Sequence, residues 1–359
     1  MKKHILIFAA TILLFASCTE KENPQTQDTS YIYGALITNE GNYGTANATI
    51  SFYDYATDKV INDIYGTANA TSGTPATLGN TVQSLYRLGN LVFIIINGSN
   101  KIEVVQASTF KHYTTITELA SPRYMLAATP NKAYISQWGN GGTVAVLNLN
   151  DNTISKTITV GAGPERMLLH GNYLYVVNSG GYGKANSISI INTLTDQVER
   201  TVTTADNPYD LVKDVDNNIW ILCSGAVEYD PITYAIINQT PSRLMRYNTG
   251  KESIDKSIIL DSTSHPIRLA IDPSGTTLYY GGGFSSTALY EFNTSDTIAP
   301  ADPFINKSVY GFNVHPATGE LFLFDAGSFT GSGKMLRYSM NGTFIKEYAT
   351  GIGPNNIAF

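Results

Sequence analysis

Short runs of alternating apolar and polar residues recur along the chain, and residues 161–203 show the pattern most clearly. Within this stretch the alternation predicts four strands, Glu165–Leu169, Tyr173–Asn178, Ser187–Asn192 and Gln197–Thr203. Gly, Asn and Asp separate the runs, and these residues tolerate the positive φ angles of tight turns. β-branched and aromatic residues fill the runs, as expected of half-buried strands. Four short strands in about forty residues is the size of one blade of a β-propeller.

The same unit repeats along the sequence. A proline stands before the first strand of five units, and these prolines are Pro122, Pro164, Pro208, Pro266 and Pro354, spaced by 42, 44, 58 and 88 residues. The interval of 58 is one period with an insertion, and the interval of 88 is two periods, with a blade starting at Val309–Phe312. Residues 82–117 form a further unit, 31–65 supply three strands and 355–359 supply one. We therefore predict an all-β fold, a seven-bladed β-propeller of four-stranded blades whose C-terminal strand completes the N-terminal blade and hides two sheet edges.

The first thirty residues have the pattern of an exported and tethered protein. Lys2, Lys3 and His4 precede an apolar run that is too short for a membrane span, which predicts a secretory signal over residues 1–17. Small residues directly before Cys18 resemble a bacterial lipoprotein cleavage site, so Cys18 is the expected lipid anchor; an ordinary signal with an incidental cysteine is the alternative. The polar stretch 18–30 predicts a flexible tether, and residues 31–359 a single propeller domain.

Composition narrows the classes of partner. A net charge of −6 with only 23 basic residues argues against nucleic acid. After lipidation of Cys18 only Cys223 would remain, so the mature domain has no disulfide. Charged residues make up just 14% of the chain, and 23 tyrosines are present. Tyr and Asn on loops suit a binding surface, although most tyrosines are expected to fill strands.

One face of the predicted propeller carries the candidate site. With strands lettered A to D outward from the axis, the B–C and D–A connections fall on the same face, and they are varied and rich in glycine. Function generally resides on such variable loops over a rigid scaffold. Aromatic residues of this face are predicted to ring its mouth, with Trp138 and Tyr182 as the main anchors of a ligand. The ring comprises Tyr43, Trp138, Tyr182, Tyr229, Phe284 and Phe329.

Polar residues of the same connections complete the predicted ligand-binding set. From the B–C loops they are Asn39, Glu40, Asn42, Asn97, Gln137, Asn140 and Asn178. From the D–A connections, nearer the axis, they are Arg123, Tyr124, Glu165, Arg166, Tyr209, Asp210, Arg268 and Asn355. About half of the second group is expected to join neighbouring blades by hydrogen bonds rather than contact a ligand.

The sequence contains no positive signal for catalysis. It has no phosphate loop, nucleophile elbow or HExxH motif, and its five histidines show no metal-ligand spacing. A few carboxylates are expected at the mouth (Glu40, Glu165, Asp210 and Asp325), where a pair could act as acid and base or bind calcium, and the sequence leaves both open. We predict a binding protein with no catalytic residue, no metal ligand and no cofactor.

The repeated pattern also resembles a known family. A Gly, Asn or His before proline, then a strand, a turn, a tyrosine-led strand and a glycine loop resembles the YncE-like seven-bladed propellers over residues 31–359. The opening ITNEGNYGTANATISFYD (37–54), together with the leader, is similar to surface lipoproteins of Bacteroidetes of the BtuG type, which capture corrinoids. Acidic residues just after Cys18 resemble the surface-export signal of such lipoproteins.

This resemblance implies a function. The protein would be lipid-anchored in the outer membrane, exposed at the cell surface, and would capture cobalamin or a related corrinoid and pass it to a TonB-dependent transporter. The corrinoid would be a transported ligand rather than a cofactor. Two other classes stay open, namely a propeller enzyme of the lactonase or lyase kind and a glycan- or protein-binding surface lipoprotein.

Overall fold

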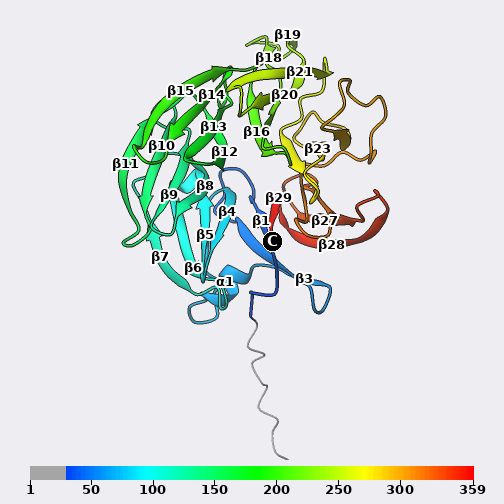
Figure 1. Cartoon of the computed structure of the whole chain (residues 1–359). Coiled ribbons are helices and arrows are strands. Elements are labelled where there is room, and N and C mark those ends of the chain that lie inside the picture. The colour runs from blue at the N-terminus through cyan, green and yellow to red at the C-terminus, as the bar shows by residue number, and fades with distance from the viewer. Residues whose placement is uncertain (1–29) are drawn as a thin grey trace, which may run out of the picture.

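The computed structural model describes residues 30–359 and confirms the seven-bladed β-propeller. Small antiparallel sheets stand around a common axis, and the chain passes once round the ring (Figure 1). Within residues 30–359, no helix is long and apolar enough to cross a membrane. The expected signal segment, Cys18 and all of the expected tether except Ser30 lie outside the described residues, so these remain predictions.

Each blade runs from an inner strand A to an outer strand D. The first three blades consist of β29 (Pro354–Ala358), β1 (Gly34–Asn39), β2 (Thr49–Asp54) and β3 (Lys59–Ile61); β4 (Val82–Leu88), β5 (Leu91–Ile96), β6 (Lys101–Gln106) and β7 (His112–Ile116); and β8 (Pro122–Thr129), β9 (Lys132–Gln137), β10 (Thr143–Asn148) and β11 (Thr153–Thr159). The fourth and fifth blades consist of β12 (Pro164–His170), β13 (Tyr173–Asn178), β14 (Ser187–Asn192) and β15 (Gln197–Thr203); and β16 (Pro208–Lys213), β17 (Ile219–Cys223), β20 (Ser242–Asn248) and β21 (Ser253–Asp261). The last two consist of β22 (Arg268–Ile271), β23 (Thr277–Gly281) and β24 (Tyr290–Asn293); and β25 (Gly311–Val314), β26 (Leu321–Asp325), β27 (Ser332–Tyr338) and β28 (Phe344–Ile352).

The burial of the strands explains the sequence pattern. The middle strand β13 is almost continuously buried, because neighbouring blades cover both faces of the sheet. The outer strand β15 alternates between exposed and half-buried residues, as a period of two requires. Three of the four strands predicted within 161–203 match the structure in full, and the first is one residue longer at each end than predicted.

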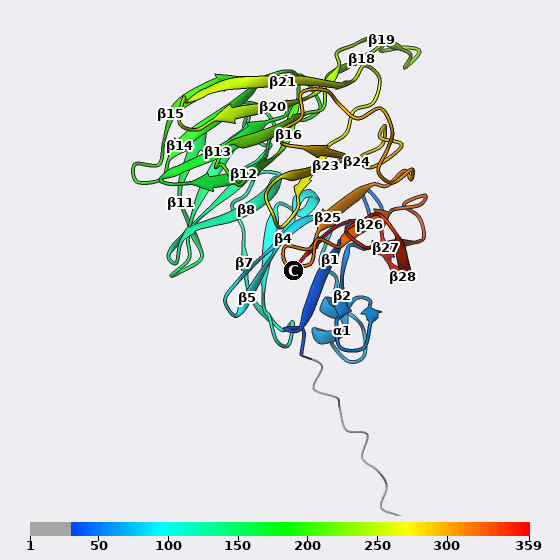
Figure 2. The same cartoon turned by 45° about the vertical axis from the view of Figure 1, so that its right-hand side comes forward.

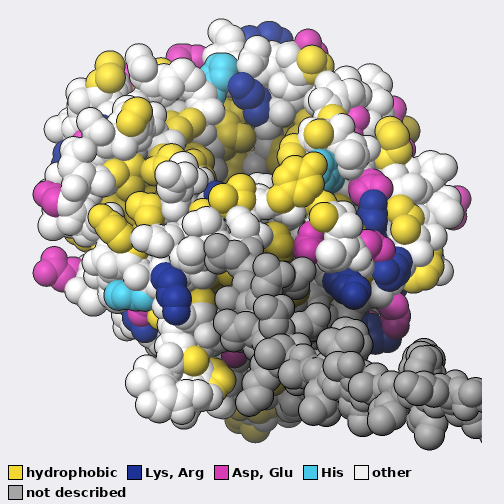
Figure 3. Space-filling model, turned by 90° about the horizontal axis from the view of Figure 1, so that it is seen from below, with side chains coloured by type: hydrophobic (Ala, Val, Ile, Leu, Met, Phe, Trp, Pro, Cys, Tyr) yellow, Lys and Arg dark blue, Asp and Glu magenta, His cyan; other side chains and the backbone are white. Residues whose placement is uncertain are grey.

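The hydrophobic core lies between successive blades. Between the fifth and sixth blades, Trp220 is fully buried and its ring meets Phe292 edge-on at 5.7 Å between centroids. The indole N–H of Trp220 donates to Asp214 at 2.9 Å, so its one polar group is satisfied. On the outside, the face in Figure 3 mixes basic and acidic side chains and does not gather them by sign.

The two ends of the described chain meet in one sheet, which confirms the predicted closure. Strand β29 pairs antiparallel with β1, with Ile357 opposite Ile37. In Figures 1 and 2 the blue N-terminal strands and the red C-terminal strands lie side by side. Both isoleucines are buried and pack with Phe322 and Phe324 of the seventh blade. The closing strand therefore contributes hydrogen bonds to the first blade and apolar contacts to the last.

Three segments differ from the regular unit. The sixth blade has three paired strands instead of four. In place of an outer strand, an isolated β-bridge joins Leu289 and Ile305. The insertion in the fifth blade forms its own hairpin, β18 (Val227–Tyr229) and β19 (Ile236–Gln239). The connection from the first to the second blade contains a short helix, α1 (Ile64–Ala68), which the alternation of the sequence did not predict.

Ile357→Ala should test the closure without deleting a strand. Ile357 is 1% exposed, so truncation should lower the free energy of unfolding by about 2–5 kcal/mol through lost burial and a residual cavity. The control Ile237→Ala, on the exposed hairpin strand β19, should change it by less than about 0.5 kcal/mol. Urea unfolding of both variants measures this, and equal costs would contradict the closure as a stabilising element.

Candidate functional site

A cavity of about 770 Å³ lies at the mouth of the ring, on the predicted face. All seven blades contribute to it through their B–C and D–A connections. Its lining residues are Glu40, Gly41, Tyr43, Asn80, Thr81, Gln83, Asn97, Gly98, Asn100, Ser121, Arg123, Trp138, Glu165, Tyr182, Tyr209, Ile267, Arg268, Phe284, Tyr310 and Phe329. We call this space the axial cavity.

One position of the repeat forms the inner wall of the axial cavity. It is the residue after the proline position at the start of each A strand, and around the ring it is Asn355, Gln83, Arg123, Glu165, Tyr209, Ile267 and Tyr310. All of these except Asn355 line the cavity. The next residue along the strand points away, so Tyr124 and Arg166 instead line a smaller cavity of about 190 Å³. Arg268 holds this second position yet lines the axial cavity.

The structure brings together eleven of the residues predicted from the sequence. Those lining the axial cavity are Glu40, Tyr43, Asn97, Arg123, Trp138, Glu165, Tyr182, Tyr209, Arg268, Phe284 and Phe329. They come from all seven blades, so the site exists only in the closed ring.

Four of the predicted amides are structural. Asn39, Gln137 and Asn178 each end a B strand and are buried. The Asn178 side chain donates to Ser187 at 3.0 Å, and Gln137 accepts from the Ala120 N–H at 2.7 Å. The Asn178 bond joins two strands of one blade, and the Gln137 bond ties the B strand to the connection that enters the third blade, as expected of buried amides. The fourth, Asn355, donates to Glu40 at 2.7 Å and to the Gln83 carbonyl at 3.2 Å.

The other predicted residues lie outside the cavity lining. Tyr124 and Asp210 are buried beneath it, and Arg166 packs over the Tyr124 ring at 4.6 Å. Asn42 donates to the Phe329 carbonyl at 2.5 Å and so supports the loop of a cavity residue. Asn140 is exposed. Tyr229 is also exposed, on the β18–β19 hairpin, because the insertion pairs with itself.

Sequence reasoning missed three inner-wall residues, Gln83, Ile267 and Tyr310. Ile267 follows Pro266 directly, whereas Val82 and Val309 stand where the proline would be before Gln83 and Tyr310. Counting from the repeat period rather than from the proline would have found them. The remaining lining residues outside the predicted set are Gly41, Asn80, Thr81, Gly98, Asn100 and Ser121.

Charged side chains form a hydrogen-bonded network across the inner wall. Arg123 grips Glu165 with two bonds, of 3.2 and 2.8 Å, and also donates to Gln83. Glu165 is 1% exposed, and burial raises the pKa of its carboxyl although the adjacent Arg123 opposes this. Breaking such a buried pair would leave an uncompensated charge. Both members of the pair are therefore committed to holding the third and fourth blades together.

Glu40 is held differently, by neutral donors. It accepts from Asn355 at 2.7 Å and from the Tyr310 hydroxyl at 3.1 Å. Burial raises the pKa of the Glu40 carboxyl, and the Asn355 hydrogen bond and the charge of Arg268 only partly offset this. Burial likewise raises the pKa of Tyr310 well above its usual range. Burial thus favours the protonated form of Glu40, while its hydrogen bonds and the nearby arginines oppose it.

Aromatic side chains form two opposing walls. On one side Trp138 and Tyr182 meet edge-on at 5.2 Å between centroids, and the Arg123 guanidinium lies 4.1 Å from the Trp138 ring. On the other side Tyr310 and Phe329 meet at 4.9 Å, and Phe284 packs against both. Tyr182 is 93% exposed and Phe284 is 83% exposed. Large aromatic side chains left this open commonly mark an interaction site.

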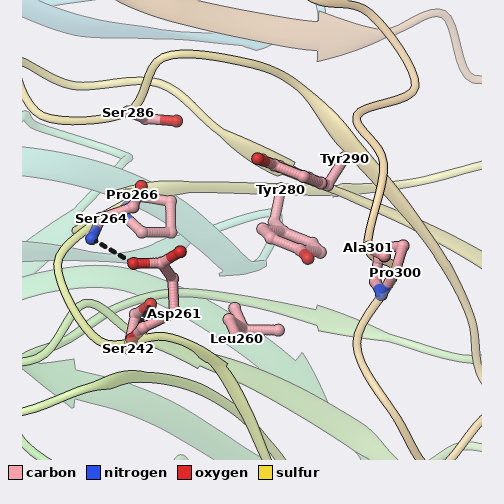
Figure 4. Close-up of a pocket in the computed structure, with 10 residues that line it drawn as sticks. All are labelled: Ser242, Leu260, Asp261, Ser264, Pro266, Tyr280, Ser286, Tyr290, Pro300 and Ala301. Carbon is pink, nitrogen blue, oxygen red and sulfur yellow. Dashed lines mark hydrogen bonds between the residues drawn. The ribbon is translucent and has the colours of Figure 1, made fainter.

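A second cavity, of about 250 Å³, lies between the fifth and sixth blades (Figure 4). In it Tyr280 and Tyr290 stack with centroids 5.3 Å apart, and Asp261 accepts from the Ser264 N–H at 2.7 Å. None of the sequence-predicted residues lines it. The axial cavity is about three times as large and draws on every blade, so we treat the axial cavity as the candidate site.

No arrangement for a metal ion is present in the described part of the chain, where no three His, Cys, Asp or Glu side chains come together as ligands. Asp325, one of the carboxylates expected at the mouth, lies 3.7 Å from Lys307 and does not line the axial cavity. The cavity offers carboxylates, guanidinium groups, amides and aromatic rings, which suits recognition of a polar ligand with flat faces.

The fold and the site together define a seven-bladed β-propeller protein with a polar, aromatic-walled axial cavity. The chain belongs to the family described as domain of unknown function (DUF5074), whose model matches residues 33–352. No curated protein matches the chain.

Two solved structures illustrate how widely the fold is shared. A quinonprotein alcohol dehydrogenase-like protein from Bacteroides thetaiotaomicron is 12% identical, with a TM-score of 0.66 over 92% of this chain and 79% of that chain. The periplasmic gluconolactonase PpgL of Pseudomonas aeruginosa is 14% identical, with a TM-score of 0.61 over 90% of this chain and 99% of that chain. At these identities the similarity establishes the fold alone.

Glu40→Gln should reveal the raised pKa of this carboxyl as a pH-dependent stability difference. The folded state binds the Glu40 proton more tightly than the unfolded chain does, so protonation stabilises the fold at low pH and this contribution is lost as pH rises through the raised pKa. The melting temperature of wild type minus that of Glu40→Gln should therefore fall as the pH rises above about 4.3, the ordinary pKa of a glutamate.

The control for this measurement is Glu347→Gln, which removes an exposed ion pair with Lys334 of 3.0 Å. The free energy of unfolding of Glu347→Gln should stay within about 1 kcal/mol of that of wild type at every pH. A difference between wild type and Glu40→Gln that is constant with pH would contradict the raised pKa.

Proposed function

We propose that this protein is a cell-surface lipoprotein that captures a corrinoid such as cobalamin in its axial cavity and passes it to a TonB-dependent outer-membrane transporter. The proposal that the axial cavity binds this ligand rests on one observation. Two aromatic walls face each other across a polar cavity of about 770 Å³. The lipid anchor at Cys18 and the surface location follow from the leader sequence.

The chemistry of the cavity suits a corrinoid. Cobalamin is a large, flat macrocycle edged with amides, so its faces need aromatic contacts and its rim needs hydrogen-bond partners. Trp138 and Tyr182 offer the first, and Asn80, Asn97 and Asn100 line the same cavity with amide groups. The volume lies in the upper part of the ~300–1,000 Å³ range of small-molecule sites, and the open mouth would let part of a larger ligand protrude.

The hydrogen bonds and ion pairs of the charged groups favour binding of a ligand over its chemical conversion. Glu165 and Arg123 hold each other, and Asp210 accepts from the Leu269 N–H at 3.1 Å while lying 3.5 Å from Arg166. Groups committed in this way position blades and are poorly placed to transfer protons to a substrate. Release to a transporter requires only that the rim contact the partner, and the exposed Tyr43, Tyr182 and Phe284 are available for that contact.

A propeller hydrolase is the second candidate function. The observation that favours it is Glu40, a carboxyl with a raised pKa that lines the cavity and could act as a general acid or base. Because the gluconolactonase PpgL has a similar fold, gluconolactone is the first substrate to try. Hydrolysis that is lost in Glu40→Gln would favour this function over capture, and retention on immobilised glycans rather than cobalamin would favour a glycan-binding protein.

Trp138→Ala and Tyr182→Ala should each weaken the binding of cyanocobalamin. Truncating an aromatic anchor commonly costs at least ~2 kcal/mol, which is about thirtyfold in affinity. Because Tyr182 is almost fully exposed, its removal should leave the melting temperature nearly unchanged. Isothermal titration calorimetry measures the affinities.

The matched control is Tyr229→Ala, an exposed tyrosine that the structure keeps out of the cavity lining. It should bind cyanocobalamin as wild type does. An equal loss of cyanocobalamin affinity in all three variants would place the binding site elsewhere. If wild type gives no binding heat, the corrinoid proposal is refuted.

Cys18→Ala tests the anchor. Without the thiol that carries the lipid, the protein should move from the membrane fraction to the soluble fraction. Protease added to intact cells should cut wild type, and cleavage only after lysis would contradict the surface location.

A further inference from the structure

We infer that Arg268 forms an anion-binding subsite on the wall of the axial cavity, and that the natural ligand places a carboxylate or phosphate group there. The inference rests on the proposed function in that the axial cavity is the binding site, but it does not require the ligand to be a corrinoid. Arg268 is the first residue of β22 in the sixth blade.

The side chain of Arg268 is buried but incompletely paired. The residue is 6% exposed and lines the axial cavity. Its Nη1 donates to the Tyr124 hydroxyl at 2.9 Å, while its Nε is buried and has no hydrogen-bond partner among residues 30–359. Within the same residues no carboxylate oxygen lies within 4.0 Å of its nitrogens as an ion pair. The charges of Asp210 and Glu165 act on Arg268 from a longer distance, but neither carboxylate is hydrogen-bonded to the guanidinium. Its unpartnered N–H groups can therefore bind an anion, and a bound anion would stabilise the buried charge.

The neighbouring arginines make the contrast clear. Arg123 has a two-bond grip on Glu165, and Arg166 lies 3.5 Å from Asp210. The remaining carboxyl of the inner wall, Glu40, is held by Asn355 and Tyr310, and its burial favours the neutral form. Of the two arginines that line the axial cavity, Arg268 is therefore the one without a carboxylate in ion-pair contact.

The loop beside Arg268 leaves room for its side chain. Gly282 has a φ of +71°, and a Cβ at this residue would lie 3.0 Å from Cγ of Arg268 and 3.1 Å from the Tyr310 carbonyl. A larger residue would be strained here and would press on the arginine stem. The glycine thus permits the path by which a residue of the second repeat position reaches the axial cavity.

The planar guanidinium fits a carboxylate or phosphate, whose paired oxygens can accept two parallel hydrogen bonds. An organic acid would supply a carboxylate, and cobalamin would supply its phosphodiester. The shared chemistry is an oxyanion with two acceptors on one side, set between the aromatic walls.

The experiment compares wild type, Arg268→Gln and Arg268→Lys by thermal melting and calorimetry at low ionic strength, with inorganic phosphate and acetate as probes. Both anions should raise the melting temperature of wild type. Arg268→Gln should bind them at least about tenfold more weakly, as expected for loss of a charged hydrogen-bond donor, and Arg268→Lys should fall between the two. Arg200→Gln is the matched control, because Arg200 also donates to a tyrosine hydroxyl, that of Tyr247, but lies on the outer strand β15.

Three results would overturn the inference: no response of wild type to either anion, an unchanged response in Arg268→Gln, or a clear loss of melting temperature in Arg268→Gln without anion, since that would make Arg268 a structural residue. Cyanocobalamin and dicyanocobinamide, which lacks the phosphate, separate this inference from the proposed function. Anion binding without cobalamin binding would refute the corrinoid and keep the subsite. If cobalamin binds wild type and Arg268→Gln with equal affinity, and neither anion binds, the subsite is refuted and the corrinoid proposal is kept.

Discussion

The pairing of β29 with β1 is the constraint on which the rest of the molecule depends. A ring of blades buries its cores between successive sheets, so an open ring would expose one apolar sheet face at each end. Closure by the last strand places the end of the chain inside the first blade, with Ile357 opposite Ile37. It also carries Asn355 to Glu40 at 2.7 Å, a contact between residues 315 positions apart. Asn355 does not line the axial cavity, but this contact holds Glu40, which does.

The closed ring converts one repeat position into a functional surface. Residues after the proline position meet around the axis, and most of their polar groups satisfy one another across blade boundaries, as between Arg123, Glu165 and Gln83. A buried polar group without a partner is costly in such a network. Arg166 and Arg268 each keep a buried Nε without a hydrogen-bond partner among residues 30–359, but Arg166 lies 3.5 Å from Asp210, whereas Arg268 has no ion pair.

The sequence predicted the architecture well because the repeat is a local pattern. Alternation located the strands of 161–203 to within a residue, and the period of the prolines led to seven blades. It also identified the face that carries the cavity, since turn length and glycine content differ between the two ends of a blade. Pairing across blades could not be predicted in this way, because the partner of Arg123 depends on how two sheets are rotated relative to each other. Tyr229 was placed in the aromatic ring, whereas the insertion folds on itself and keeps it out of the cavity lining.

A crystal structure of the protein grown with cyanocobalamin would show where the ligand lies. Density for the macrocycle is expected in the axial cavity, with its faces against the Trp138–Tyr182 wall and the Phe284–Phe329 wall, and its phosphate at Arg268. Density for the ligand elsewhere, for example between Tyr280 and Tyr290, or crystals without ligand at saturating cyanocobalamin, would contradict this proposal.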